Sequence, residues 1–103
     1  MPGTLYMLVL QTLARSEPIH GYGIAQEIQT LSDDVLQVEE GSLYPALQRM
    51  LVKGWITSEW QQVKGRRRAR FYRLTASGRS QLTVELAEFE RIVRATELVI
   101  QTT

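Results

Sequence analysis

Hydrophobic residues recur at helical spacing near the start of the chain. The pattern i, i+3, i+4, i+7, i+8 predicts a helix over residues 4–15 with an apolar stripe of Leu5, Leu8, Val9, Thr12 and Leu13. Tyr6, Met7 and Leu10 lie off this stripe. We therefore expect this helix to be covered by the rest of the protein on more than one side.

A second helix is predicted from Tyr22 to Leu31, after a break at residues 16–19. Pro18 disfavours helical backbone at the residue before it, which places the break. The second helix has one narrow apolar face, formed by Ile24, Ala25, Ile28 and Leu31. Residues 32–34 end this helix, and residues 35–38 are predicted to form a short extended piece.

The third predicted helix begins near Gly41 and Ser42 and ends at Lys53. Ser42 is the expected N-cap, which would put Pro45 in the first turn, where a missing N–H does no harm. The expected buried face consists of Leu43, Leu47, Met50 and Leu51. Gly54 is typical of a helix C′ position, with Trp55 packing back on Met50.

A β-hairpin follows, because residues 55–63 and 68–74 are rich in aromatic and β-branched residues. Residues 64–67 form the predicted turn, and Gly65 supplies its permissive φ angle. Trp60, Tyr72 and Leu74 are expected to share the inward face. Trp55 and Trp60 are predicted to be core residues rather than ligand platforms.

The last predicted helix starts at residues 75–77 and runs close to the end of the chain. Six positions are spaced 4, 3, 4, 3, 4, as in a coiled-coil seam, and all but Thr96 are apolar: Leu82, Leu86, Phe89, Val93, Thr96 and Ile100. The seam either covers the helix's own domain or meets a partner. The near-heptad spacing favours a dimer interface formed by Leu82, Leu86, Phe89, Val93 and Ile100.

Three short helices, a two-stranded ribbon and a long helix are the order of a winged helix-turn-helix. The fold class expected is mainly α with a small β-ribbon, in which residues 1–74 form a DNA-binding domain and residues 75–103 a C-terminal dimerisation helix. The second helix of a helix-turn-helix enters the major groove. In this chain that is the third helix, whose non-core side carries Ser42, Tyr44, Gln48 and Arg49.

Charge is strongly segregated although the formal net charge is only +1. Seven positive residues and no acid lie between Trp60 and Arg79, and four of them fall at the predicted ribbon tip: Lys64, Arg66, Arg67 and Arg68. Such a tip attracts phosphates through a salt-dependent term. A basic run is also commonly a solvated face, but its place on a hairpin after a candidate recognition helix favours DNA. Glu39 and Glu40 are expected to point away from the duplex or to pair with Arg49 or a wing arginine.

The residue inventory argues against an enzyme. The chain has one histidine and no cysteine, and its sequence shows neither a phosphate-binding glycine loop nor a metal-ligand cluster, so no cofactor and no metal are expected. His20 is expected to have a local packing or hydrogen-bonding role. No apolar run has the length of a membrane span and no secretory signal is evident, which fits a cytoplasmic protein. The alternative function is a winged-helix protein–protein interaction module, which has no need for a basic wing.

Four blocks of the sequence closely resemble the PadR family of transcriptional regulators. They are residues 20–24 (HGYGI), 41–50 (GSLYPALQRM), 54–56 (GWI) and 70–78 (RFYRLTASG). The resemblance covers nearly the whole chain. The GSLYP motif at residues 41–45 together with the Y-x-L-T-x-x-G motif at residues 72–78 makes it specific. The single last helix is similar to that of the small PadR subfamily with one C-terminal dimerisation helix.

The resemblance implies a cytoplasmic homodimer that represses transcription at an inverted-repeat operator in double-stranded DNA. By motif, Ser42, Tyr44 and Pro45 lie where the family's recognition helix meets DNA, and residues 64–68 lie in its wing; Gln48, Arg49 and Arg70 are added from their predicted positions. Tyr22 opens the second helix and is a candidate backbone contact. Some members bind small aromatic or drug-like effectors, but the last helix here has no tryptophan to build such a site.

Overall fold

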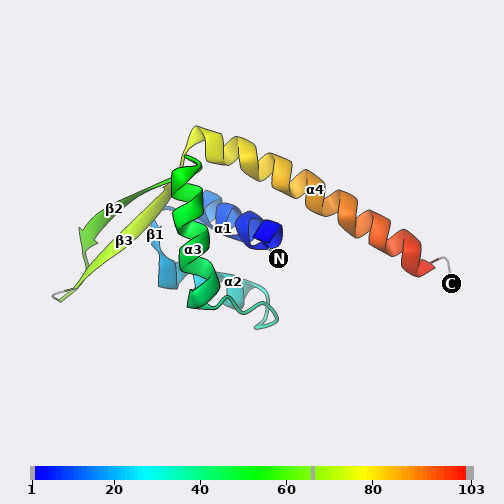
Figure 1. The fold of residues 1–103 in the computed structure, drawn as a ribbon. Helices are drawn as coiled ribbons and strands as arrows, with labels where there is room; N and C mark the ends of the chain where they lie inside the picture. Colours follow the sequence, from blue (N-terminus) through cyan, green and yellow to red (C-terminus); the bar gives the residue numbers. More distant parts are fainter. Residues whose placement is uncertain (1, 66, 102–103) are drawn as a thin grey trace.

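The computed structural model describes residues 2–65 and 67–101 of the chain. Arg66, one of the wing residues singled out above, therefore lies outside the described residues. Three short helices, a small sheet and one long helix follow each other along the chain (Figure 1). The elements are α1 (Pro2–Ser16), β1 (Ile19–His20), α2 (Gly21–Leu31), α3 (Glu40–Val52), β2 (Ile56–Gln62), β3 (Arg68–Leu74) and α4 (Ala76–Gln101).

Helix α1 is the centre of the core. Met7, Val9, Leu10 and Leu13 are buried, although Met7 and Leu10 lie off the stripe that predicted the helix. The helix packs against α2, α3, α4 and β3, so its sides are covered by different elements. The expectation that α1 is covered on more than one side is confirmed.

Helix α2 begins one residue earlier than predicted, after a short strand that the sequence did not reveal. Leu31, expected on the apolar face of α2, is 60% exposed, because the chain leaves the core at the last turn of this helix. Asp33 and Asp34 then adopt positive φ angles of 53° and 65°. Residues 35–38, expected to form a short extended piece, do not pair as a strand with the sheet.

Helix α3 begins at Glu40, and its N-cap is Glu39 in extended conformation. The prediction of Ser42 as the cap is wrong, because the amide of Ser42 already donates to the Glu39 carbonyl at 3.0 Å inside the first turn. Pro45 consequently lies beyond the first turn and withholds the amide donor that the Gly41 carbonyl would otherwise receive. The C-terminal prediction is confirmed, since Gly54 has a φ angle of 76° and the amide of Trp55 donates to the Met50 carbonyl at 3.1 Å.

The sheet has three strands in the order β1-β3-β2, all antiparallel. Strand β1 has only two residues, Ile19 and His20, which pair with Tyr72 and Phe71. Strands β2 and β3 form the predicted ribbon, from the pair Ile56–Leu74 at its base to the pair Gln62–Arg68 near its tip. Gly65 has a φ angle of 98° in the turn, as predicted.

Helix α4 begins at a tight junction with α3 and β2, which we call the α4 base (Gly54, Trp55, Thr75 and Gly78). The Thr75 hydroxyl caps α4 by accepting the Gly78 amide at 2.9 Å and donates to the Gly54 carbonyl at 2.6 Å. The Thr75 amide donates to the Trp55 carbonyl at 3.0 Å. These bonds tie the end of α3 to the start of α4.

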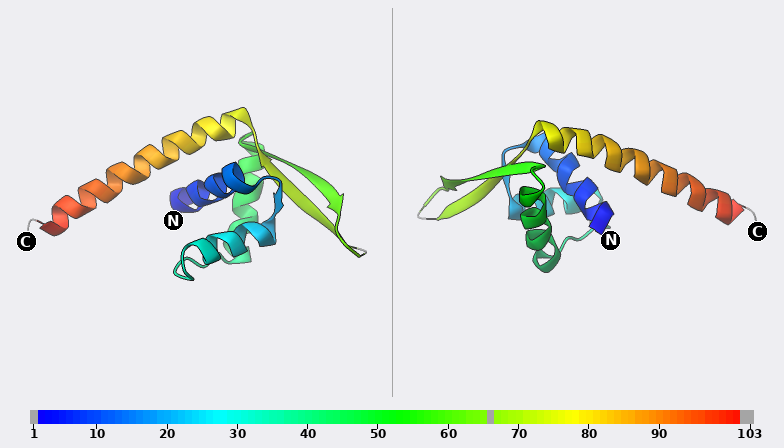
Figure 2. Two further views of the ribbon diagram at one scale, coloured as in Figure 1. Left: turned by 180° about the vertical axis from the view of Figure 1, so that it is seen from behind. Right: turned by 45° about the horizontal axis from the view of Figure 1, so that its top comes forward.

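Beyond its base, α4 runs along α1 and then away from the other elements, as Figures 1 and 2 show. This extension makes the molecule 58 Å long but only 29 Å and 22 Å across. Leu82 is buried, whereas the later seam residues Phe89, Val93 and Ile100 are 44%, 39% and 65% exposed. Among the residues that the structure describes, no helix has the length and hydropathy of a membrane span.

Candidate nucleic-acid interface

An open cleft of about 550 Å³ lies between the start of α2, one side of α3 and the ribbon. We call it the helix–wing cleft. Helix α3 contributes Tyr44 and Gln48, and the start of α2 contributes Tyr22. The ribbon contributes polar and aromatic residues from both strands and the turn, among them Trp60, Arg67, Arg68, Arg70 and Tyr72. Two of the predicted residues of the recognition helix, Tyr44 and Gln48, thus meet predicted wing arginines across one cleft.

One face of the ribbon changes character along its length. The register puts Ile56, Ser58 and Trp60 of β2 on the same face as their partners Leu74, Tyr72 and Arg70 of β3. At the base this face is apolar and in the core, with Ile56 2% and Tyr72 3% exposed. Towards the tip it becomes aromatic and cationic. The same face of the ribbon therefore packs in the core at the base and faces the cleft near the tip.

Trp60 lies on the predicted face but not in the core. It is 57% exposed, because this part of the ribbon extends beyond the residues that cover Ile56 and Tyr72. The guanidinium carbons of Arg68 and Arg70 lie 5.4 Å and 5.9 Å from the centroid of its ring. The prediction of a core tryptophan is wrong for Trp60, whereas the half-buried Trp55 does pack against the core.

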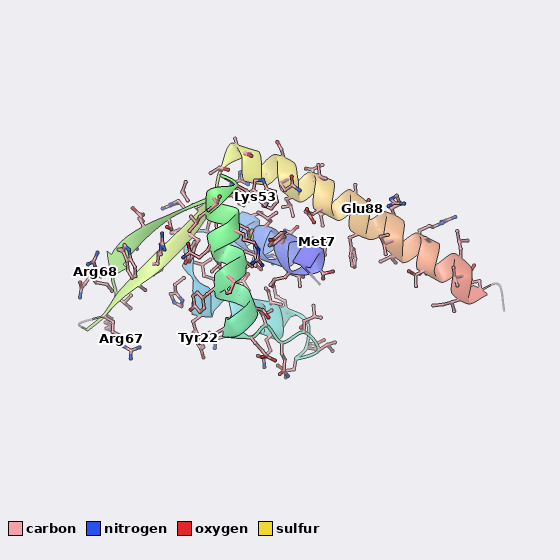
Figure 3. All side chains as sticks on the ribbon, viewed as in Figure 1. Met7, Tyr22, Lys53, Arg67, Arg68 and Glu88 are labelled. Carbon is pink, nitrogen blue, oxygen red and sulfur yellow. The ribbon has the colours of Figure 1, made fainter. Side chains whose placement is uncertain are left out.

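Arg70 is the best-fixed of the wing arginines. Its Nε donates to the Ser58 hydroxyl at 2.8 Å, while its guanidinium carbon lies over the Trp60 ring. Arg67 and Arg68 are exposed at the outer end of the ribbon, as Figure 3 shows. Within residues 2–65 and 67–101, no carboxylate forms an ion pair with any of the three. Their charge is available to an external anion.

Ser42, Pro45 and Arg49 lie on a different flank of α3. They line a second groove of about 510 Å³ with Leu5 and Leu8 of α1 and with residues 36–39. Arg49 is held towards α1, because its Nε donates to the Tyr6 hydroxyl at 2.7 Å and its guanidinium lies 5.8 Å from the Tyr6 ring centroid. The helix pattern placed these side chains outside the core correctly, but it did not separate the two flanks.

Tyr44 rests on Gly21, which explains why glycine suits that position. A Cβ atom at residue 21 would lie 2.8 Å from Cε1 and 2.9 Å from the hydroxyl oxygen of Tyr44. Tyr44 remains 40% exposed, so its ring closes the inner end of the cleft without entering the core. Burial raises the pKa of the neighbouring Tyr72 above its ordinary value of 10.0, an effect that Arg70 opposes. The Tyr72 hydroxyl is therefore neutral at physiological pH.

His20 has the local role expected of it. Its Nδ1 accepts the amide of Gly23 at 3.0 Å and so caps α2, and its ring meets the edge of Phe71 at 5.3 Å. Tyr22 stacks against His20 with ring centroids 6.4 Å apart and is 61% exposed at the rim of the cleft. Figure 3 shows Tyr22 at the opposite end of α3 from Lys53.

The acidic residues before α3 stay apart from the arginines. Glu39 and Glu40 are both exposed, and neither pairs with Arg49 or a described wing arginine. Of the two expected roles for these carboxylates, ion pairing with an arginine is therefore not observed. In the same described residues, no three histidine, aspartate or glutamate side chains gather to hold a metal ion. The side chains that the cleft does present are phenol, amide, indole and guanidinium groups, which bind phosphates, sugars and bases.

Comparisons with known proteins identify the family. Residues 9–84 match the model of the transcriptional regulator PadR-like family. The chain is 38% identical over 81 residues to the transcriptional regulator Rv3488 of Mycobacterium tuberculosis, which covers 79% of this chain and 72% of that protein.

Solved structures have the same fold. A PadR family transcriptional regulator from Eggerthella lenta is 30% identical with a TM-score of 0.80, over 98% of this chain and 85% of that one. Bacillus subtilis PadR, solved in complex with operator DNA, is 24% identical with a TM-score of 0.72, over 81% of this chain and 46% of that one. The family match places the chain among transcriptional regulators rather than enzymes. The chain belongs to the PadR-like family of transcriptional regulators.

Proposed function

We propose that this regulator is a cytoplasmic homodimer that binds an inverted-repeat operator and represses transcription. In each protomer α3 enters the major groove, and the wing contacts the backbone or the adjacent minor groove. The observation that carries the proposal is the helix–wing cleft, in which Tyr44 and Gln48 face Arg67, Arg68 and Arg70, and no described carboxylate pairs with these arginines. The operator complex of the structurally similar Bacillus subtilis PadR supports it.

Base readout is assigned to the exposed residues of α3. Gln48 offers an amide able to form two hydrogen bonds with adenine, and Tyr44 offers a hydroxyl at the edge of the cleft. Ser42, Pro45 and Arg49 belong to the same interface from the other flank of α3, where Arg49 reaches a phosphate after exchanging its bond with Tyr6. Tyr22, Lys64 and Arg66 complete the backbone contacts.

Dimerisation is assigned to α4. In the proposed assembly residues 1–74 form the DNA-binding unit and residues 75–103 the dimerisation helix, with Leu82, Leu86, Phe89, Val93 and Ile100 along the seam. The exposure of Phe89, Val93 and Ile100 supports this, because the described residues of the same chain leave 39–65% of the surface of these apolar residues exposed. A two-fold partner would place two helix–wing clefts on one duplex, as an inverted repeat requires.

The test is selection of bound sites from a pool of random duplexes at moderate salt. We expect an enriched inverted repeat whose half-sites are about one helical turn apart, roughly 34 Å. A protein in which Arg67 and Arg68 are both changed to Glu is the control and should select nothing while its sedimentation coefficient stays unchanged. Failure of the unaltered protein to enrich any sequence would refute the proposed function and favour a protein-interaction module.

A further inference from the structure

The wing carries an exposed tryptophan, Trp60, that does not contribute to the hydrophobic core. Trp60 is 57% exposed and does not belong to the core cluster or to the half-buried shell around it. An indole left this accessible on the face of a candidate binding cleft is more informative than an exposed aliphatic residue, because tryptophan is large and normally covered. Its position on the cleft side of β2 follows from the register with Arg70.

Two guanidinium groups share the ring of Trp60. Arg70 is its direct cross-strand partner, and Arg68 lies diagonally across, two residues nearer the tip. Their guanidinium carbons lie 5.9 Å and 5.4 Å from the ring centroid, both within the distance at which a cation is attracted by an aromatic face. Ser58, two residues before Trp60, fixes Arg70 further by accepting its Nε at 2.8 Å. Both arginines are therefore restrained by the same ring in the absence of any ligand.

We propose that Trp60 is a positioning residue of the DNA-binding site. Its ring holds Arg68 and Arg70 so that both guanidinium groups reach phosphates of one strand of the duplex, the strand whose backbone lies in the helix–wing cleft. The inference rests on the proposed function, since it requires a duplex in that cleft. Trp60 acts through the two arginines and not through a base contact of its own.

The physical basis is preorganisation. An arginine side chain has many rotamers, and a binding partner must restrict them before the charge-assisted bonds to phosphate form. In this wing the ring of Trp60 and the hydroxyl of Ser58 impose part of that restriction beforehand. Loss of the ring removes part of the restriction on two arginines in each protomer and should therefore weaken binding of the dimer to its duplex by about tenfold.

The first measurement compares three substitutions at this position by fluorescence anisotropy with a selected duplex. Trp60→Phe keeps an aromatic face and should bind within about threefold of the unaltered protein, whereas Trp60→Leu and Trp60→Ala should each lose about tenfold. Thr57→Ala is the matched control, since Thr57 is also exposed on β2 but lies on the opposite face of the ribbon. Equal affinities of the phenylalanine, leucine and alanine variants would overturn the proposal.

The second measurement is a double-mutant cycle, which a merely structural role would not satisfy. The background is Arg68→Ala with Arg70→Ala, and there Trp60→Ala should cost less than twofold. The background alone should reduce the slope of log K against log salt by about 1.8 per protomer, and by about 3.6 for a dimer on one duplex, because each lost phosphate contact removes about 0.9. A full tenfold cost of Trp60→Ala in that background, or an unchanged salt slope, would overturn the positioning role.

Failure of this inference is distinguishable from failure of the proposed function. If the unaltered protein does not bind the selected duplex, both fall. If it binds and the Trp60 variants bind equally well with unchanged melting temperatures, the regulator stands and only the role of Trp60 is refuted. Trp60 lies outside the core, so the variants are expected to fold, and their circular dichroism spectra check this.

Discussion

Helix α4 passes close to the backbone of Trp55 at the α4 base, and Gly78→Ala tests the importance of this contact. A Cβ atom at residue 78 would run into the carbonyl oxygen of Trp55 and lie 3.0 Å from the carbonyl carbon and 3.1 Å from a methyl group of Leu74. The oxygen belongs to the backbone and accepts the amide of Thr75 at 3.0 Å, so it cannot turn aside as a flexible side chain would. Relief of the clash requires α4 to move away from β2.

The magnitude follows from three terms. Overpacking at a fixed position costs about 1–3 kcal/mol. Separation of the segments weakens the two bonds of Thr75 to the Gly54 and Trp55 carbonyls, each about 1 kcal/mol. Alanine regains about 1 kcal/mol of helix propensity over glycine. We expect a net loss of about 2–4 kcal/mol of unfolding free energy.

Urea denaturation followed by circular dichroism measures this loss, at one fixed protein concentration because the proposed dimerisation would add to the apparent stability. Gly41→Ala is the matched control, since a Cβ atom there meets nothing within 4 Å and the residue lies in the first turn of α3. It should be neutral or stabilise the protein by up to about 1 kcal/mol. If Gly78→Ala behaves like Gly41→Ala, the account of the α4 base is refuted.

Three further perturbations address the dimer, the α1–α4 junction and the core tyrosine. Phe89→Glu should give monomers in sedimentation velocity while Phe89→Leu stays dimeric, and a dimeric glutamate variant would show that the interface lies elsewhere. Glu17→Gln should cost about 1–2 kcal/mol in urea denaturation, because the carboxylate accepts the Leu74 amide at 2.6 Å and pairs with Arg79 at 2.9 Å; equal stability would refute this. The pKa of Tyr72 is raised in the folded protein, so the stability that its neutral hydroxyl contributes is present below pH 10 and is lost as the pH rises further. Tyr72→Phe should therefore flatten the fall in unfolding free energy at alkaline pH, and an unchanged fall would contradict this account.

The sequence predicted most of the helices because their apolar periodicity was strong. It also predicted the end of α3, since a glycine followed by an apolar residue is specific to one kind of helix terminus. The start of α3 was missed because its N-cap, Glu39, makes no side-chain capping bond and its first residue is another glutamate, Glu40. Strand β1 was missed because two residues carry no periodicity.

The sequence predicted which residues lie at the candidate site, but not on which side of α3 each lies or how deeply each is buried. Strand alternation gave the correct face for Trp60, yet it carries no information on how far the body of the protein covers that face. Helical periodicity placed Arg49 outside the core, but only the bond to Tyr6 shows that it turns to α1. Tertiary contacts decide such questions, and a single sequence does not contain them.

The α4 base links the direction of α4 to the position of the wing. Glu17 binds the last residue of β3 through the Leu74 amide and the first turns of α4 through Arg79, while Thr75 joins α4 to the end of α3. The same few bonds therefore fix α3, the ribbon and α4 relative to one another. In the proposed dimer, the partner determines where α4 lies, so the α4 base sets the distance between the two helix–wing clefts. Changes at Glu17 or Gly78 should consequently alter the tolerance for half-site spacing more than the choice of bases within a half-site.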